Sequence, residues 1–134
     1  MIVPSGVLFD LDGVIFQGDR LIPGAEGVIH KLQIAKIPYR FITNTTRMTK
    51  YNLINMLSKM GFSVNPKEIF AAPHAASEYC KLKRYKNISL IVPDEEMKED
   101  FSTFQFVDKN PEAIVVGDIG KLFTFELLNH LFLN

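Results

Sequence analysis

The chain has 134 residues, 47% of them hydrophobic and 11% aromatic, which excludes a disordered protein and fits one ordinary domain or two smaller pieces. Fifteen basic residues balance fifteen acidic ones, so charge does not indicate nucleic acid or an acidic membrane surface as a partner. The single cysteine, Cys80, excludes an internal disulfide framework, and no Cys/His spacing indicates zinc.

The chain opens on a short apolar run that does not look like a targeting signal. Residues 6–9 predict a buried strand, but Asp10 and Asp12 break the run and no basic segment precedes it. No apolar stretch reaches the length that spans a membrane. We therefore expect a cytoplasmic protein without a membrane partner.

The first half of the chain predicts strands that alternate with helices. Pro38 ends the first helix, Thr45 or Thr46 should cap the second, and Gly61 should end it. The expected elements are the strand at 6–9, a helix at 25–36, a strand at 39–43, a helix at 49–60, a weak strand at 68–71 and a helix from 73 to about 83.

The second half repeats this alternation. Pro93 and Asp94 should start a helix, and the basic run at 81–86 is a candidate boundary between two units. The other expected elements are strands at 87–92, 104–107 and 113–117 and a helix at 122–133. Alternating strands and helices predict an α/β fold with a mostly parallel sheet. Because the last helix has no stop signal and no strand after it, we expect an incomplete chain.

Two carboxylates follow the first predicted strand, at Asp10 and Asp12. Residues two apart in a strand point to the same side, so these side chains should lean toward one spot. That spot lies beyond the carboxyl end of the strand, where open α/β sheets bind ligands. Mg²⁺ would relieve the repulsion between the carboxylates and attract phosphate oxygens. Asp10 could then act as a nucleophile and Asp12 as a general acid and base, although both residues would also suit a plain loop.

The strand at 39–43 ends in polar residues at the same expected sheet edge. Thr43 offers a hydroxyl and Asn44 an amide, just before the next helix. Helix N-termini bind anions readily, so a phosphate could sit beside these two residues. A helix cap is the alternative role for the threonines that follow.

These two segments resemble the haloacid dehalogenase superfamily of phosphotransferases. "FDLDGV" looks like its first motif and "FITNT" like its second. The longer strings "DLDGVIFQGDRLIPGA" and "FITNTTRMTK" look like the type IIA branch, which includes NagD-like and HDHD-type phosphatases. "EIFAAPHAASEY" resembles the passage into the cap of that branch, and "AIVVGDIGKLFTFELLNHLFL" a strand and helix within the cap.

The resemblance implies a fold and a chemistry. Residues 1–80 would be the N-terminal part of a Rossmann-like core, and residues 81–134 the first part of an α/β type C2 cap. Asp10 would be the phosphorylated nucleophile and Asp12 the acid and base. Asp10 and the backbone carbonyl of Asp12 would bind Mg²⁺. Leu11, Thr43 and Asn44 would hold the phosphate. The reaction would be hydrolysis of a phosphate monoester on a phosphorylated small molecule.

The family's third and fourth motifs, a lysine and an acidic metal site, have no match here. Asp118 follows an apolar run but lies where a cap strand belongs, and Leu122 and Phe123 stand where a second aspartate should follow. We therefore reject Asp118 as a metal ligand and Lys121 as the missing lysine. Without a positive clamp on the phosphate, we expect these 134 residues alone to hydrolyse poorly or not at all.

Two other functions remain open from the sequence. The chain could be a catalytically inactive, truncated fragment that acts as an interaction module, because half a core exposes a sheet edge that a homo-oligomer would cover. A receiver-type phosphoacceptor also uses aspartates at strand ends with Mg²⁺. That class carries its acidic pair and its phosphorylated aspartate on different strands, and here no aspartate ends the second strand.

Overall fold

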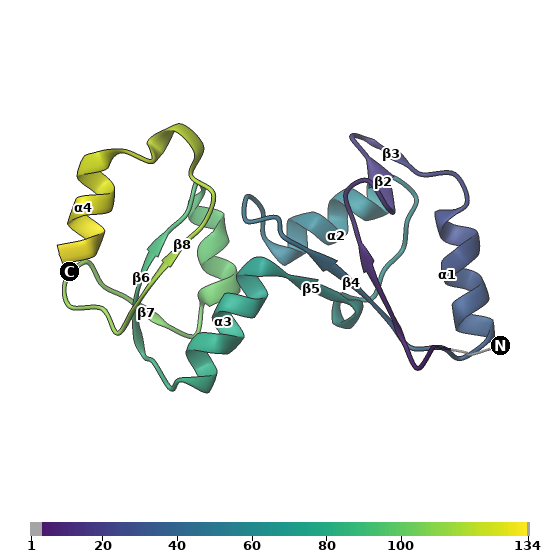
Figure 1. Cartoon of the computed structure of the whole chain (residues 1–134), viewed down its shortest axis with the longest axis horizontal. Coiled ribbons are helices and arrows are strands. Elements are labelled where there is room, and N and C mark those ends of the chain that lie inside the picture. The colour runs from purple at the N-terminus through teal and green to yellow at the C-terminus, as the bar shows by residue number, and fades with distance from the viewer. Residues whose placement is uncertain (1–3, 134) are drawn as a thin grey trace. The chain divides into compact units, whose positions relative to one another are not determined.

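A computed structural model describes residues 4–133, which form two compact units (Figure 1). The first unit comprises the chain up to Asn44 together with Lys50–Ala71. The second comprises Thr45–Thr49 and the chain from Ala72 onward. No helix among the described residues is long and apolar enough to cross a membrane.

The first unit contains a three-stranded parallel sheet with the strand order β1-β4-β5. The strands are β1 (Val7–Asp10), β4 (Tyr39–Thr43) and β5 (Ile69–Ala71), with α1 (Ala25–Ile34), α2 (Lys50–Lys59) and the short 3-10 helix η1 (Pro66–Glu68) between them. Asp10 pairs with Ile42, and Thr43 pairs with Ala71. The strands therefore end together at one edge of the sheet.

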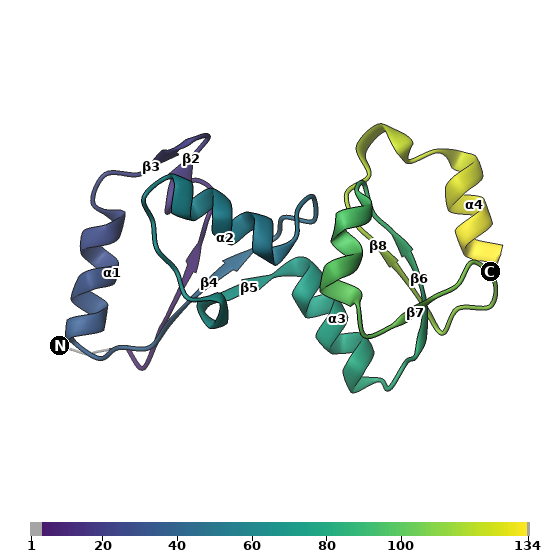
Figure 2. The ribbon, with the colours of Figure 1, turned by 180° about the vertical axis from the view of Figure 1, so that it is seen from behind.

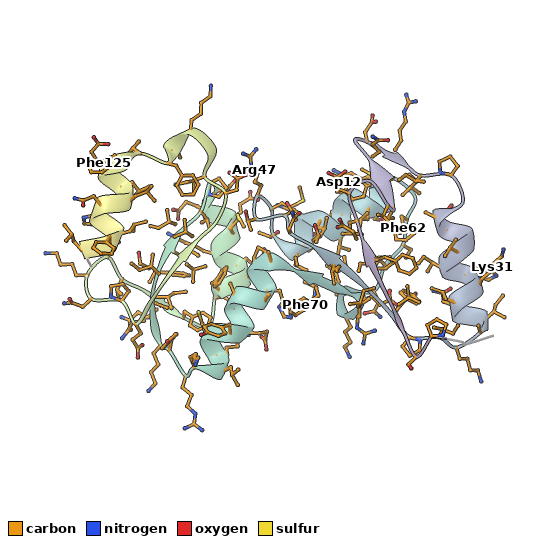
Figure 3. All side chains as sticks on the ribbon, in the orientation of Figure 1. Asp12, Lys31, Arg47, Phe62, Phe70 and Phe125 are labelled. Carbon is orange, nitrogen blue, oxygen red and sulfur yellow. The ribbon has the colours of Figure 1, made fainter. Side chains whose placement is uncertain are left out.

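The two faces of this sheet differ in burial. The connections run β1 to β4 to β5 in one direction, so right-handed crossovers place α1 and α2 on the same face. Phe41 is buried on this face, with its ring centroid 5.6 Å from that of Phe62, which follows α2 (Figure 3). On the other face Leu8, Ile42 and Phe70 are 66%, 38% and 44% exposed. Parallel sheets are normally covered on both faces. In this sheet the face that carries Leu8, Ile42 and Phe70 is exposed.

A tight turn follows β1. The Leu11 carbonyl accepts hydrogen bonds from the backbone N–H groups of Val14, Ile15 and Phe16, at 3.3, 2.8 and 3.2 Å. Gly13 has a φ of 76°, a left-handed conformation that L side chains rarely adopt. The turn leads into a hairpin that the sequence analysis missed, formed by β2 (Phe16–Gln17) and β3 (Arg20–Leu21).

The second unit has its own parallel sheet with the order β7-β6-β8 (Figure 2). Its elements are α3 (Ala72–Leu82), β6 (Asn87–Ile91), the 3-10 helix η2 (Glu95–Phe101), β7 (Gln105–Phe106), β8 (Ala113–Val116), the 3-10 helix η3 (Gly120–Leu122) and α4 (Phe125–Leu133). Cys80 of α3 is buried in a cluster with Ile88, Phe101 and Phe104. Because α3 packs into this cluster, the compact units divide at Ala71 and Ala72, before the expected boundary at 80/81.

Two helix starts differ from the sequence analysis. The caps expected at Thr45 and Thr46 are wrong, because α2 begins at Lys50 and the Thr46 hydroxyl oxygen accepts a hydrogen bond from the Asp118 backbone N–H. The helix expected from Pro93 and Asp94 is a 3-10 helix, although Asp94 does cap it by accepting from the Glu96 backbone N–H at 3.0 Å.

We predict that Gly13→Ala destabilises the first unit by about 1–2 kcal/mol, since a Cβ strains a left-handed residue. Gly27→Ala is the matched control. Gly27 lies inside α1, a Cβ there would meet no atom within 4 Å, and alanine should add about 0.5–1 kcal/mol of stability. Urea unfolding followed by circular dichroism measures both. Equal effects of the same sign would contradict the conformational argument.

A second prediction concerns pH and the second unit. The Glu112 side chain accepts hydrogen bonds from the backbone N–H groups of Lys86 and Asn87, at 2.7 and 2.8 Å. The Asn87 and then the Lys86 N–H group lower the pKa of the Glu112 carboxyl from its ordinary 4.5. Stability from this carboxylate is therefore present above pH 4.5 and lost as the pH falls through the lower folded value.

Glu112→Gln should accordingly destabilise the protein near neutral pH, and the gap from the wild type should shrink on acidification below the ordinary pKa. Urea midpoints at several pH values measure this gap. Glu99→Gln is the control, because Glu99 is an exposed carboxylate of the same unit at η2. A gap that widens as the pH falls would contradict the assigned direction.

Candidate functional site

Asp10 is the last residue of β1, and its side chain is exposed at the carboxyl edge of the sheet. Its Oδ1 accepts a hydrogen bond from the Leu11 backbone N–H at 2.8 Å. The Leu11 side chain is buried at 1% exposure. Leu11 could therefore face a phosphate only through its backbone, and in this structure that amide orients the Asp10 carboxylate.

Asp12 is exposed on the turn that follows β1 (Figure 3). Two residues of this turn, Leu11 and Ile15, have buried side chains that hold it against the core. Asp12 also forms an isolated bridge with Phe16, at the start of the hairpin. Exposed Asp10, buried Leu11 and exposed Asp12 thus continue the alternation of an extended chain, which presents both carboxylates to solvent.

Thr43 and Asn44 lie at the same edge of the same sheet as Asp10. Asp10 is in register with Ile42, so Thr43 is the next residue beyond that pair on the neighbouring strand. Thr43 is half-buried and Asn44 is exposed. The sheet register therefore brings together the ends of the two strands that carry the sequence-predicted residues.

The donor chemistry of this edge suits a hard divalent cation. Two carboxylates supply oxygen ligands without nitrogen or sulfur, and Mg²⁺ in proteins typically takes one or two carboxylates plus water and phosphate oxygens. Among the described residues, no group of three or more His, Cys, Asp or Glu side chains could hold a metal ion. Asp10 and Asp12 are the residues that would hold one here.

Asp118, which the sequence analysis rejected as a metal ligand, has other partners in the structure. Its Oδ2 accepts a hydrogen bond from Arg47 Nε at 2.9 Å, and its Oδ1 accepts one from the Gly120 backbone N–H at 2.9 Å. These bonds lower the pKa of the Asp118 carboxyl, the Arg47 bond most strongly. No local sequence pattern indicates that Arg47 pairs with Asp118, because the two residues lie 71 positions apart.

Comparison with known proteins matches residues 7–107 to the haloacid dehalogenase-like hydrolase family. A rat relative, haloacid dehalogenase-like hydrolase domain-containing protein 2, is 33% identical over 130 residues, which cover 97% of this chain and 49% of that protein. The human phospholysine phosphohistidine inorganic pyrophosphate phosphatase is 27% identical over 131 residues, covering 95% of this chain and 47% of that protein. The chain thus spans about half the length of these relatives.

Solved structures share the fold. A hypothetical protein from Pyrococcus horikoshii has a TM-score of 0.82 and 27% identity, over 97% of this chain and 54% of that one. NagD from Escherichia coli also has a TM-score of 0.82, at 20% identity, over 98% and 54% of the two chains. The family match covers most of the sequence, including both strands that form the carboxylate edge. This chain belongs to the haloacid dehalogenase-like hydrolase family.

Proposed function

We propose that this chain carries the nucleophilic half of a Mg²⁺-dependent phosphatase that cleaves phosphate monoesters of small molecules through an aspartyl-phosphate. One observation carries the proposal. Because β1 and β4 pair in parallel, their last residues, Asp10 and Thr43, lie at the same edge of the sheet, and exposed Asp12 lies on the turn that follows β1. Family membership supports the reaction class. The human relative is itself named as a phosphatase.

The proposed reaction uses two side chains in turn. An oxygen of the Asp10 carboxylate attacks phosphorus, the bond to the leaving oxygen breaks, and Asp12 donates a proton to that oxygen. Water then attacks the phosphorus of the acyl phosphate while Asp12 takes its proton. Inorganic phosphate leaves, and the Asp10 carboxylate is restored. The Leu11 amide, bonded to Asp10 Oδ1, would orient the other oxygen for attack.

Binding groups for the phosphate and the cation complete the proposed site. Thr43 and Asn44 would hold phosphate oxygens, together with the backbone at Leu11. Mg²⁺ held by the Asp10 carboxylate and the Asp12 backbone carbonyl would neutralise the charge that gathers on the phosphoryl group, which leaves the Asp12 carboxyl to carry the proton. We propose that the first unit is part of the catalytic core and the second is part of the cap, in a cytoplasmic protein. The residues between 72 and 80 would then belong with the cap.

A second candidate function is an interaction module without activity. The bare sheet face at Leu8, Ile42 and Phe70 favours it, because a parallel sheet needs a cover on both sides. The relatives are about twice as long as this chain, so the remaining half of such a protein is one cover. The two functions differ in whether Asp10 becomes phosphorylated.

The decisive experiment is intact-mass analysis after incubation with Mg²⁺ and an aryl phosphate. The wild type should gain one phosphoryl group that hydroxylamine removes, as expected of an acyl phosphate. Asp10→Asn should gain none, because an amide is not a nucleophile here. Asp12→Asn should retain the group longer than the wild type, because its hydrolysis lacks a base. Omitting Mg²⁺ should abolish labelling.

Glu26→Gln is the matched control, since Glu26 is an exposed carboxylate of α1 in the same unit. It should be labelled as the wild type is. Phosphate release by Asp10→Asn at the wild-type rate would discard Asp10 as the nucleophile. Labelling needs one phosphoryl transfer per chain and no turnover, so it is compatible with the poor hydrolysis expected from the sequence. No labelling of any form would reject the phosphatase proposal for this chain and favour the interaction module.

A further inference from the structure

The chain leaves the candidate phosphate site directly into the second unit. Thr43 and Asn44 belong to the first unit, whereas Thr45–Thr49 belong to the second and Lys50 returns to the first. A single peptide bond therefore joins Asn44 to a segment whose contacts lie far along the sequence. The contacts of Thr45–Thr49 therefore constrain the backbone that directly follows Asn44.

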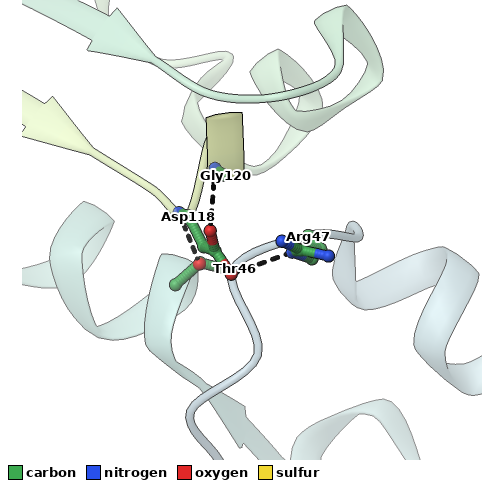
Figure 4. A network of polar contacts seen from close by, with 4 residues as sticks. All are labelled: Thr46, Arg47, Asp118 and Gly120. Atoms are coloured by element: carbon green, nitrogen blue, oxygen red, sulfur yellow. Dashed lines mark hydrogen bonds and ion pairs between the residues drawn. The ribbon is translucent and has the colours of Figure 1, made fainter. Parts of the chain in front are cut away.

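Polar contacts with the loop after β8 hold the segment (Figure 4). The Asp118 backbone N–H donates to the Thr46 hydroxyl oxygen at 2.8 Å, and Arg47 Nε donates to Asp118 Oδ2 at 2.9 Å. The Gly120 backbone N–H donates to Asp118 Oδ1 at 2.9 Å, which keeps the carboxylate turned toward Arg47. We call these four residues, Thr46, Arg47, Asp118 and Gly120, the tether.

Close backbone approach supports the tether. A Cβ on Gly117 would lie 3.3 Å from the Thr46 carbonyl oxygen, and one on Gly120 would lie 3.4 Å from Arg47 Nη2. The Gly117 contact is tighter than ordinary van der Waals contact and involves backbone, whereas the Gly120 contact is at the limit of that range and involves the end of a flexible side chain. Glycine at position 117 therefore lets the loop after β8 approach the segment closely.

A cavity lies beside Thr46. Thr46 lines a cavity of about 170 Å³ together with apolar side chains of the second unit, among them Pro73, Val92, Met97 and Phe101. A cavity provides no dispersion contacts on its open side. The hydrogen bonds and the ion pair of the tether are therefore specific contacts that attach Thr46 and Arg47 to the second unit.

We propose that Asp118 is a positioning residue, which fixes Thr45–Thr49 in the second unit and thereby constrains the phosphate ligands Thr43 and Asn44. This proposal rests on the phosphate site proposed above. The Asp118 carboxylate accepts hydrogen bonds from Arg47 and Gly120, and its backbone N–H donates one to Thr46. Asp118 therefore takes part in every hydrogen bond of the tether. Loss of its carboxylate frees Arg47 and leaves the peptide after Asn44 with more conformations, which makes the ordering of the phosphate ligands more costly.

Limited trypsin digestion tests the attachment without any need for activity. Arg47 is itself a cleavage point, and fragment masses identify the cut between Arg47 and Met48. Cleavage in the native state tracks the population in which the segment is detached. Asp118→Asn removes the charge and should raise this cleavage rate about 1.4- to five-fold, the change in the detached population that corresponds to the free energies of exposed ion pairs. Asp118→Ala also removes the acceptor for Gly120 and should raise it further.

Inorganic phosphate in the presence of Mg²⁺ tests the link to the phosphate ligands. Its dissociation constant, measured by isothermal titration, should rise in the order wild type, Asp118→Asn, Asp118→Ala. Urea unfolding checks that each variant is still folded under the conditions of the titration. Glu78→Gln is the matched control, because it breaks the exposed Glu78–Lys81 ion pair on α3 and should alter neither cleavage nor phosphate affinity.

The outcomes separate the two proposals. Unchanged cleavage in Asp118→Ala would overturn the tether. Faster cleavage with unchanged phosphate affinity would overturn the positioning role. If the unaltered chain binds no phosphate, the phosphate site itself fails, and digestion still decides whether Asp118 holds the segment.

Discussion

Parallel pairing of β1 with β4 is the constraint on which the candidate site depends. The register of Asp10 with Ile42 fixes where each strand ends, so a carboxylate and a hydroxyl that are distant in sequence reach one edge. The buried Leu11 and Ile15 then pin the turn that carries Asp12. A shift of one residue in this register would move the carboxylate to the opposite face of the sheet.

Local patterns predicted most elements but not their partners. The strand at 39–43 was predicted with the bounds of β4, and in the structure buried Tyr39 and Phe41 alternate with exposed neighbours. The β2–β3 hairpin was missed, although a two-residue connection at Gly18 and Asp19 is a recognised hairpin signal. Strands of two residues offer too few alternating positions for a period to be detected.

Residues of the candidate site that have a local sequence signal could be predicted, whereas contacts between residues distant in sequence could not. Asp10, Asp12, Thr43 and Asn44 could be selected from the sequence because each lies at the end of a predicted strand or within three residues after it. The roles of Thr46 and Arg47 could not, since both bind a residue more than 70 positions away. Thr46 looked like a helix cap, because a hydroxyl suits that position equally well and sequence spacing does not identify its donor.

Membership of Thr45–Thr49 in the second unit makes both units discontinuous in sequence. A gene fragment cut between Ala71 and Ala72 would encode this segment without the loop that binds it, and the complementary fragment would lack the segment. Neither fragment would reproduce its unit as it stands in the whole chain. Domain-dissection studies would instead need a linker in place of the segment in one fragment, and the same residues grafted onto the other.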